Sequence, residues 1–293
     1  MISINGEAIA LLAALSNPAA AEHQKALHLR DVALSQSDES YTNLILNFGR
    51  ILACPLYEEN HPDTRTSFQN KDPTSAIQLD HDPTLWRQYR QMAGLLLKNS
   101  LLKPPFKSEA PVANVPKLRV KLIAEDSVKN ELKEILLRCM TDSDSQIRSV
   151  AGSCIASCSV TSSQPGNSMF SLNEWREIIS FITSCLQNQS SGDNGVDGAF
   201  NALVKLCEDR PTLLDSEALG RPLNILVPLF LQYFEASKVK YRKYSLQCLN
   251  HLIEYLPGAL IVNMNAFLAG LSKLSQDSDP AVRQQVCRAI VSM

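Results

Sequence analysis

The sequence lacks the short motifs that mark the common nucleotide-binding and hydrolytic enzymes. It contains no Gly-x-x-x-x-Gly-Lys-Ser/Thr loop, whose backbone amides would hold nucleotide phosphates, and no Gly-x-Gly-x-x-Gly dinucleotide fingerprint. The nucleophile motif Gly-x-Ser-x-Gly and the zinc motif His-Glu-x-x-His are absent as well. The sequence therefore predicts a protein that is not an enzyme.

Metal-binding patterns are also missing, although the chain has 8 cysteines and 5 histidines. No two cysteines form a Cys-x-x-Cys pair, and the histidines are not spaced to complete a ligand set; His251 is expected to be a packed or surface side chain. Cys154 and Cys248 each follow an arginine, Arg148 or Arg242, by six residues, which indicates a small buried side chain at a repeated position. We expect no metal, no cofactor and a reducing compartment.

The chain has little excess charge and no long apolar run. It carries 28 Lys and Arg against 30 Asp and Glu, and its net charge of −2 gives no basic field for nucleic acid. No stretch reaches the roughly 18 apolar residues that a membrane-spanning helix needs. The first seven residues lack the basic start of a signal peptide. We expect a soluble, intracellular protein that binds neither nucleic acid nor a membrane.

One short phrase occurs twice and indicates a repeat protein. Asp142–Arg148 (DSDSQIR) recurs as Asp277–Arg283 (DSDPAVR), 135 positions later, and each copy separates two apolar helical runs. The offset holds three periods of about 45 residues, within the range of HEAT and armadillo repeats. An aromatic content of only 6% fits helices that pack through aliphatic side chains. The predicted fold class is all-α, a right-handed α-α superhelix of the HEAT/armadillo-like solenoid type.

Helical periodicity divides the chain into about six hairpins. Two irregular, proline-containing stretches, 55–81 and 103–126, interrupt them, and 159–168 is a further break. The expected helix pairs are Ile4–Ser16 with Ala20–Leu34, Tyr41–Cys54 with Asp82–Leu102, Ser127–Met140 with Ser145–Cys158, Leu172–Asn188 with Gly195–Asp209, Pro222–Ala236 with Val239–Leu256, and a sixth pair from about Ala259 to the end of the sequence.

Some residues recur at equivalent positions of these hairpins. They are Arg90, Arg148, Asp197, Arg242 and Arg283, and glycine follows the first two by four residues. Glycine on a helix lets a neighbouring backbone approach closely, and aspartate before a helix caps its free N–H groups. We interpret the repeated residues as architectural. The last helical run ends without a polar cap, so we expect the sequence to be a fragment of a longer solenoid.

Four separated segments carry a resemblance to a known family. They follow one another in the family's order and cover about Asp82 to Met293. They are Gly94–Asn99, Gly198–Asp209, Arg221–Phe234, and Asp279–Arg283 with Val286–Ala289. They resemble the second, fourth, fifth and sixth HEAT repeats of the transportins, or karyopherin-β2 proteins, which are importin-β-type nuclear import receptors. The resemblance implies an importin-β N-terminal type region at about 1–103 and HEAT repeats at about 127–293.

The resemblance also implies a function and a partner. In this family the N-terminal repeats bind the small GTPase Ran in its GTP form on the concave face. Phe-Gly nucleoporins dock between outer helices, and cargo nuclear-localisation signals bind C-terminal repeats that lie beyond residue 293. A receptor of this kind shuttles between cytoplasm and nucleus through the nuclear pore.

Carried over to this chain, the resemblance implies Ran contacts at Lys98 and Asn99, with Arg90 earlier on the same helix, and at Glu208 and Asp209. Two architectural readings stay open, because Lys98 can simply favour a helix end and Glu208 and Asp209 can simply be solvated.

A second class of protein fits the same repeats. A HEAT scaffold of another kind, such as a phosphatase-type regulatory subunit, would hold partner proteins through its inter-repeat loops. Such scaffolds keep an even repeat length with short turns, and the irregular stretches at 55–81 and 103–126 argue against that alternative.

Overall fold

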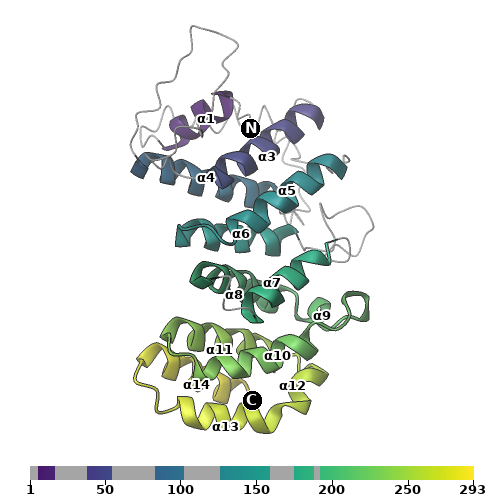
Figure 1. Cartoon of the computed structure of the whole chain (residues 1–293), viewed down its shortest axis with the longest axis vertical. Coiled ribbons are helices and arrows are strands. Elements are labelled where there is room, and N and C mark those ends of the chain that lie inside the picture. Colours follow the sequence, from purple (N-terminus) through teal and green to yellow (C-terminus); the bar gives the residue numbers. More distant parts are fainter. Residues whose placement is uncertain (1–5, 17–37, 55–82, 102–125, 159–174, 188–191) are drawn as a thin grey trace, which may run out of the picture. The chain divides into compact units, whose positions relative to one another are not determined.

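The computed structural model describes residues 6–16, 38–54, 83–101, 126–158, 175–187 and 192–293 (Figure 1). All regular structure in these ranges is helical, and none of it is strand. The described residues form two compact units, one up to Cys139 and the other from Met140 onwards. We describe each unit by itself.

The first unit contains α1 (Gly6–Ser16), α3 (Asp38–Ala53), α4 (Pro83–Leu101) and α5 (Asp126–Cys139). Helix α4 packs against both α1 and α3, and α3 also packs against α5. Each helix turns an apolar stripe inward, so that Leu12, Phe48 and Leu97 are completely buried. A salt bridge of 2.7 Å between Arg50 Nε and Glu131 Oε1 joins α3 to α5.

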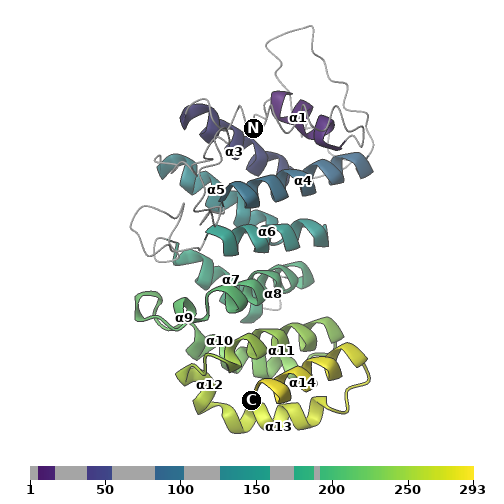
Figure 2. The same cartoon turned by 180° about the vertical axis from the view of Figure 1, so that it is seen from behind.

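The second unit is a set of helical hairpins. Its α-helices are α6 (Ser145–Cys158), α7 (Glu177–Gln187), α8 (Gly192–Asp209), α9 (Pro211–Leu214), α10 (Leu223–Gln232), α11 (Val239–Ile253), α12 (Gly258–Val262), α13 (Met264–Leu274) and α14 (Pro280–Ser292), with short 3₁₀ turns at Glu217–Leu219 (η3) and Tyr233–Glu235 (η4). Helices α6, α8, α11 and α14 pack one against the next, and α10 packs against both α7 and α13 (Figures 1 and 2). The unit therefore has one row of second helices and one row of first helices.

Gly152, which follows Arg148 by four residues, lies at a close contact between α6 and α8. A methyl group on Gly152 would come within 2.9 Å of the backbone of Asn201 and Ala202. The sequence did not single out Gly198, where the approach is closer still: a methyl group there would stand 1.9 Å from the carbonyl oxygen of Met140. Both glycines allow backbones to approach closer than a side chain permits.

The repeated arginines bind the turn between the two helices of their own hairpin. In three hairpins, Nη1 of the arginine donates to the carbonyls six and five residues before it. The pairs are Arg148 to Asp142 (2.6 Å) and Ser143 (3.0 Å), Arg242 to Ala236 (2.7 Å) and Ser237 (3.1 Å), and Arg283 to Asp277 (2.6 Å) and Ser278 (3.0 Å). A cation at these carbonyls satisfies acceptors that the turn leaves open. The architectural interpretation is confirmed for these three residues.

Two of these arginines also bind an aspartate further along the chain. Arg148 Nη2 lies 2.7 Å from Asp197 Oδ2 and joins α6 to α8, with both side chains 6% exposed. Arg242 Nε lies 2.7 Å from Asp277 Oδ2 in the turn before α14. The expected aspartate cap is present at α14, where Asp279 Oδ1 accepts from the backbone N–H of Ala281 at 2.7 Å. Asp197, placed by the sequence among the equivalent positions, is thus the partner of one arginine.

The cysteines are free thiols, as expected for small buried side chains. Seven of the eight are buried, including Cys154 and Cys248, and Cys287 is exposed. Burial raises the pKa of the Cys158 and Cys248 thiols well above the usual value, so both stay protonated at neutral pH.

Most expected helices in the described part are observed, with ends shifted by a few residues. Helix α7 begins at Glu177, five residues after the expected start at Leu172. The sequence missed the short helical turns α9 and η3, which lie in connections, whereas α12 begins one residue before the expected start of the sixth pair at about Ala259. The expected helix Ala20–Leu34 and the irregular stretches 55–81 and 159–168 lie outside the described residues. The same holds for the stretch 103–126 except for its last residue, Asp126, which begins α5.

Candidate partner-binding site

Lys98 and Asn99 lie in the last turn of α4. The side chain of Asn99 is exposed and that of Lys98 is half-buried. The preceding residue, Leu97, is completely buried in the core. Leu95 is 49% exposed and lies four residues before Asn99, so the two share one face of the helix. The sequence treated Leu95 only as part of a leucine run. Together, Leu95, Lys98 and Asn99 form a surface with one apolar side chain and two polar side chains.

Arg90 lies on the same helix but in the interior. Its side chain is 1% exposed, and its Nε donates to the carbonyl of Leu52 at the end of α3, at 2.9 Å. A partner cannot reach a guanidinium that is enclosed between α3 and α4. The expectation of a surface contact is corrected here, because Arg90 belongs with the architectural arginines.

Glu208 and Asp209 end α8, and both side chains are exposed. Lys205 Nζ lies 2.7 Å from Glu208 Oε2, and this hydrogen bond lowers the pKa of Glu208 below its usual value. Glu208 is therefore negatively charged at neutral pH. Carboxylates at the C-terminal end of a helix face the negative end of its dipole, which is unfavourable. The pair with Lys205 on the same helix offsets this cost for Glu208.

His251 on α11 is close enough to Glu208 and Asp209 for their charges to affect its pKa. This histidine is half-buried, and desolvation lowers its pKa below 6.5, which outweighs the opposite effect of Glu208, Asp209 and Glu254. The imidazole is therefore neutral at pH 7 and offers one donor and one acceptor. Sequence analysis placed His251 among packed or surface histidines and did not connect it with Glu208.

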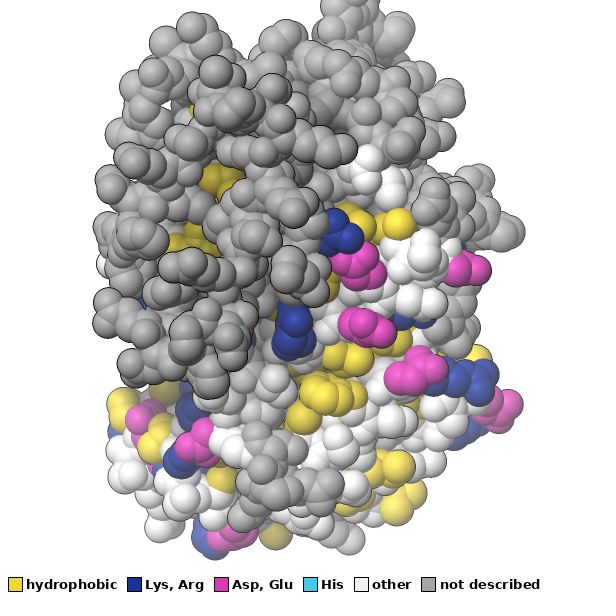
Figure 3. All heavy atoms as spheres, turned by 45° about the horizontal axis from the view of Figure 1, so that its top comes forward, with side chains coloured by type: hydrophobic (Ala, Val, Ile, Leu, Met, Phe, Trp, Pro, Cys, Tyr) yellow, Lys and Arg dark blue, Asp and Glu magenta, His cyan; other side chains and the backbone are white. Residues whose placement is uncertain are grey.

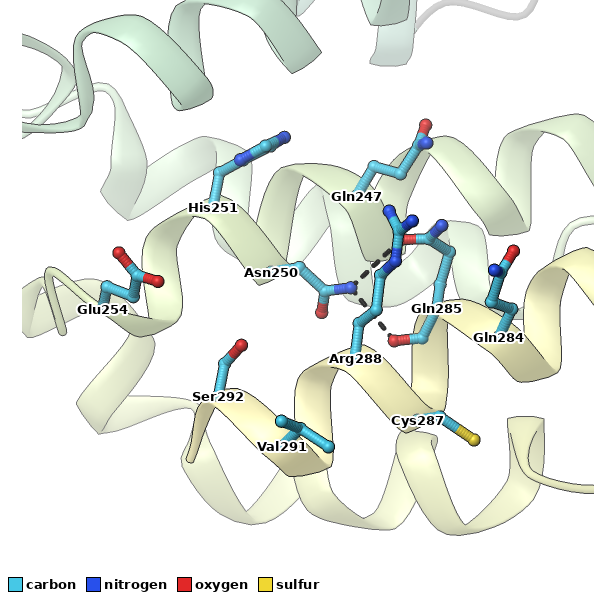
Figure 4. A pocket seen from close by; sticks show the side chains of 10 residues that line it. All are labelled: Gln247, Asn250, His251, Glu254, Gln284, Gln285, Cys287, Arg288, Val291 and Ser292. Atoms are coloured by element: carbon cyan, nitrogen blue, oxygen red, sulfur yellow. Dashed lines mark hydrogen bonds between the residues drawn. The ribbon is translucent and has the colours of Figure 1, made fainter.

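Beyond His251, a groove of about 440 Å³ runs between α11 and α14 (Figure 4). Its lining side chains are mostly polar, and many are amides. They are Gln247, Asn250, His251, Glu254, Gln284, Gln285, Cys287, Arg288, Val291 and Ser292. Asn250 Nδ2 donates to the backbone oxygen of Gln285 at 3.0 Å and to its Oε1 at 3.2 Å. The Oδ1 atom of Asn250 is buried and accepts no hydrogen bond.

One wall of this groove is visible in the sequence as a polar face of α11. Gln247, Asn250, His251 and Glu254 are spaced as i, i+3, i+4 and i+7, which places them on one face of α11. A polar stripe of this kind is ordinary on a solvated helix. Only the packing of α14 beside α11 turns it into the wall of a groove.

Charges of both signs are mixed over the described part of the face that Figure 3 shows. In the face shown in Figure 3, Lys and Arg side chains lie among Asp and Glu side chains and do not gather into a patch of one sign. Within the described ranges, no three His, Cys, Asp or Glu side chains are grouped so that they could hold a metal ion. No helix in that part of the chain has the length and apolar character needed to cross a membrane.

The candidate residues lie in both units. Leu95, Lys98 and Asn99 belong to the first unit, and Glu208 and Asp209 belong to the second. We treat them as two separate surfaces.

Comparison with known proteins identifies the relatives of the chain. No protein-family model matches the sequence. Human Transportin-1 is 33% identical over 204 residues, which are 70% of this chain and 20% of that protein. Transportin of Dictyostelium discoideum is 31% identical over 208 residues, or 70% of this chain and 21% of that protein. The chain thus spans about a fifth of the length of the curated relatives it matches.

Solved structures agree on the fold. A crystal structure of importin beta has a TM-score of 0.67 at 15% identity, covering 98% of this chain and 28% of that one. The structure of the Kap95:Nup1 complex has a TM-score of 0.66, also at 15% identity, and covers 98% of this chain and 29% of that one. These likenesses confirm the predicted class, an all-α superhelix of the HEAT/armadillo type. Within that class, the chain is a transportin homologue over about 70% of its length.

Proposed function

We propose that the chain is part of a nuclear import receptor of the transportin type, which shuttles between cytoplasm and nucleus. The observation that carries the proposal is the identity of 33% to human Transportin-1 over 70% of the chain. Solved structures of the same fold support it, because they include the Kap95:Nup1 complex, Kap121p bound to Nup53p, and Kap95p with RanGDP. The proposed partners are the small GTPase Ran in its GTP form and Phe-Gly nucleoporins.

Two surfaces are proposed to contact Ran. One is Lys98 and Asn99, which lie beside the exposed Leu95 on α4. The other is the acidic pair Glu208 and Asp209, which stands at the unfavourable end of the α8 dipole. Residues that cost helix stability and are exposed to solvent are good candidates for binding.

The test is a titration of the chain with Ran loaded with a non-hydrolysable GTP analogue, with Ran-GDP as the reference. We expect selective binding to the GTP form. Replacing Lys98 and Asn99 by alanine should weaken it by at least tenfold. The chain offers a matched control in the dipeptide Lys129-Asn130 on α5, which has the same residue types and lies on another helix. Its double alanine variant should bind like the wild type.

The acidic surface is tested in the same assay. We expect Glu208→Gln with Asp209→Asn to weaken binding, and Asp215→Asn with Glu217→Gln, a second pair of acidic residues in the same unit, to leave it unchanged. Equal binding of both nucleotide forms, or no binding by a chain whose circular dichroism is helical, would contradict the proposal and favour the scaffold alternative.

A further inference from the structure

We draw no further inference here: the strongest candidate, the surface patch of exposed apolar side chains on the packed helices α10 and α12 (Ile225, Ile261 and Val262), carries no proposal because nothing in the structure shows what covers it.

Discussion

Replacing Asp197 by alanine removes the carboxylate that joins three successive second helices. Asp197 Oδ2 accepts from Arg148 Nε on α6 at 2.8 Å, and its Oδ1 lies 3.0 Å from Lys240 Nζ on α11. Asn201 Nδ2 is a weak additional donor at 3.4 Å. The carboxylate side chain is only 6% exposed. In the variant, Arg148 and Lys240 lose this carboxylate. The loss of stability depends on whether water can replace it at each of the two cations.

The size of the effect follows from the exposure of the two cations. Lys240 is 41% exposed and regains water, so its share is at most about 1 kcal/mol, as for surface pairs. Arg148 is 6% exposed and loses the partner of Nε and Nη2, although Nη1 keeps two carbonyls. Breaking a buried pair costs about 3–5 kcal/mol, and the retained carbonyls favour the lower end. We expect a loss of about 3 kcal/mol in the free energy of unfolding.

Urea unfolding followed by circular dichroism measures this loss. A thermodynamic cycle with Arg148→Met and the double variant isolates the pair, because neither charge remains uncompensated in the double variant. The double variant should therefore lose less than the sum of the two single losses. Lys205→Ala, which breaks an exposed pair, should change stability by less than about 1 kcal/mol. A loss below about 1 kcal/mol for Asp197→Ala, or strict additivity in the cycle, would refute the reasoning.

Two further predictions concern packing and pH. Gly198→Ala places a methyl group 1.9 Å from a backbone oxygen that cannot move aside like a side chain, and it should cost about 1–3 kcal/mol or more in urea unfolding. Gly258→Ala, with nothing within 4 Å of its added methyl group, should be neutral or slightly stabilising. The hydrogen bond from Arg242 lowers the pKa of Asp277 in the folded chain. The ionised Asp277 therefore stabilises the fold at pH values above its unfolded pKa of about 3.9, and this stabilisation is lost as the pH falls through the lower pKa of the folded state. The stability difference between wild type and Asp277→Asn should shrink on acidification, and a difference that stays constant from pH 6 to pH 2 would contradict this.

The sequence could predict the hairpins because their turns carry chemistry at fixed spacing. An arginine that binds the carbonyls six and five residues before it must recur with its turn, and this recurrence is visible at Arg148 and Arg283 without any structure. The aspartate partner was harder to assign. Asp197 stands 49 residues after Arg148, and only the packing of α6 against α8 shows that it accepts from that arginine.

Helical periodicity could not predict which of the long polar side chains are buried and which are exposed. Arg90 and Lys98 lie on one amphipathic helix, and both are long basic side chains of the kind usually found at the surface. Arg90 is interior because the end of α3 offers it the carbonyl of Leu52, a contact between segments 38 residues apart in the chain. The groove was missed for the same reason, since one wall comes from α11 and the other from α14.

Polar residues on the row of second helices in the second unit divide into two groups. Arg148, Arg242 and Asp197 have partners inside the unit, and these partners account for their presence. Glu208 and Asp209 stand where the helix dipole disfavours them, and Asn250 keeps a buried oxygen without a donor. Glu208 pairs with Lys205 of its own helix and Asn250 Nδ2 binds Gln285, but neither contact moves the carboxylates away from the helix end or supplies a donor to the asparagine oxygen. A partner that brings cations to the exposed carboxylates would offset the unfavourable dipole, so the end of α8 is a candidate binding surface of this unit.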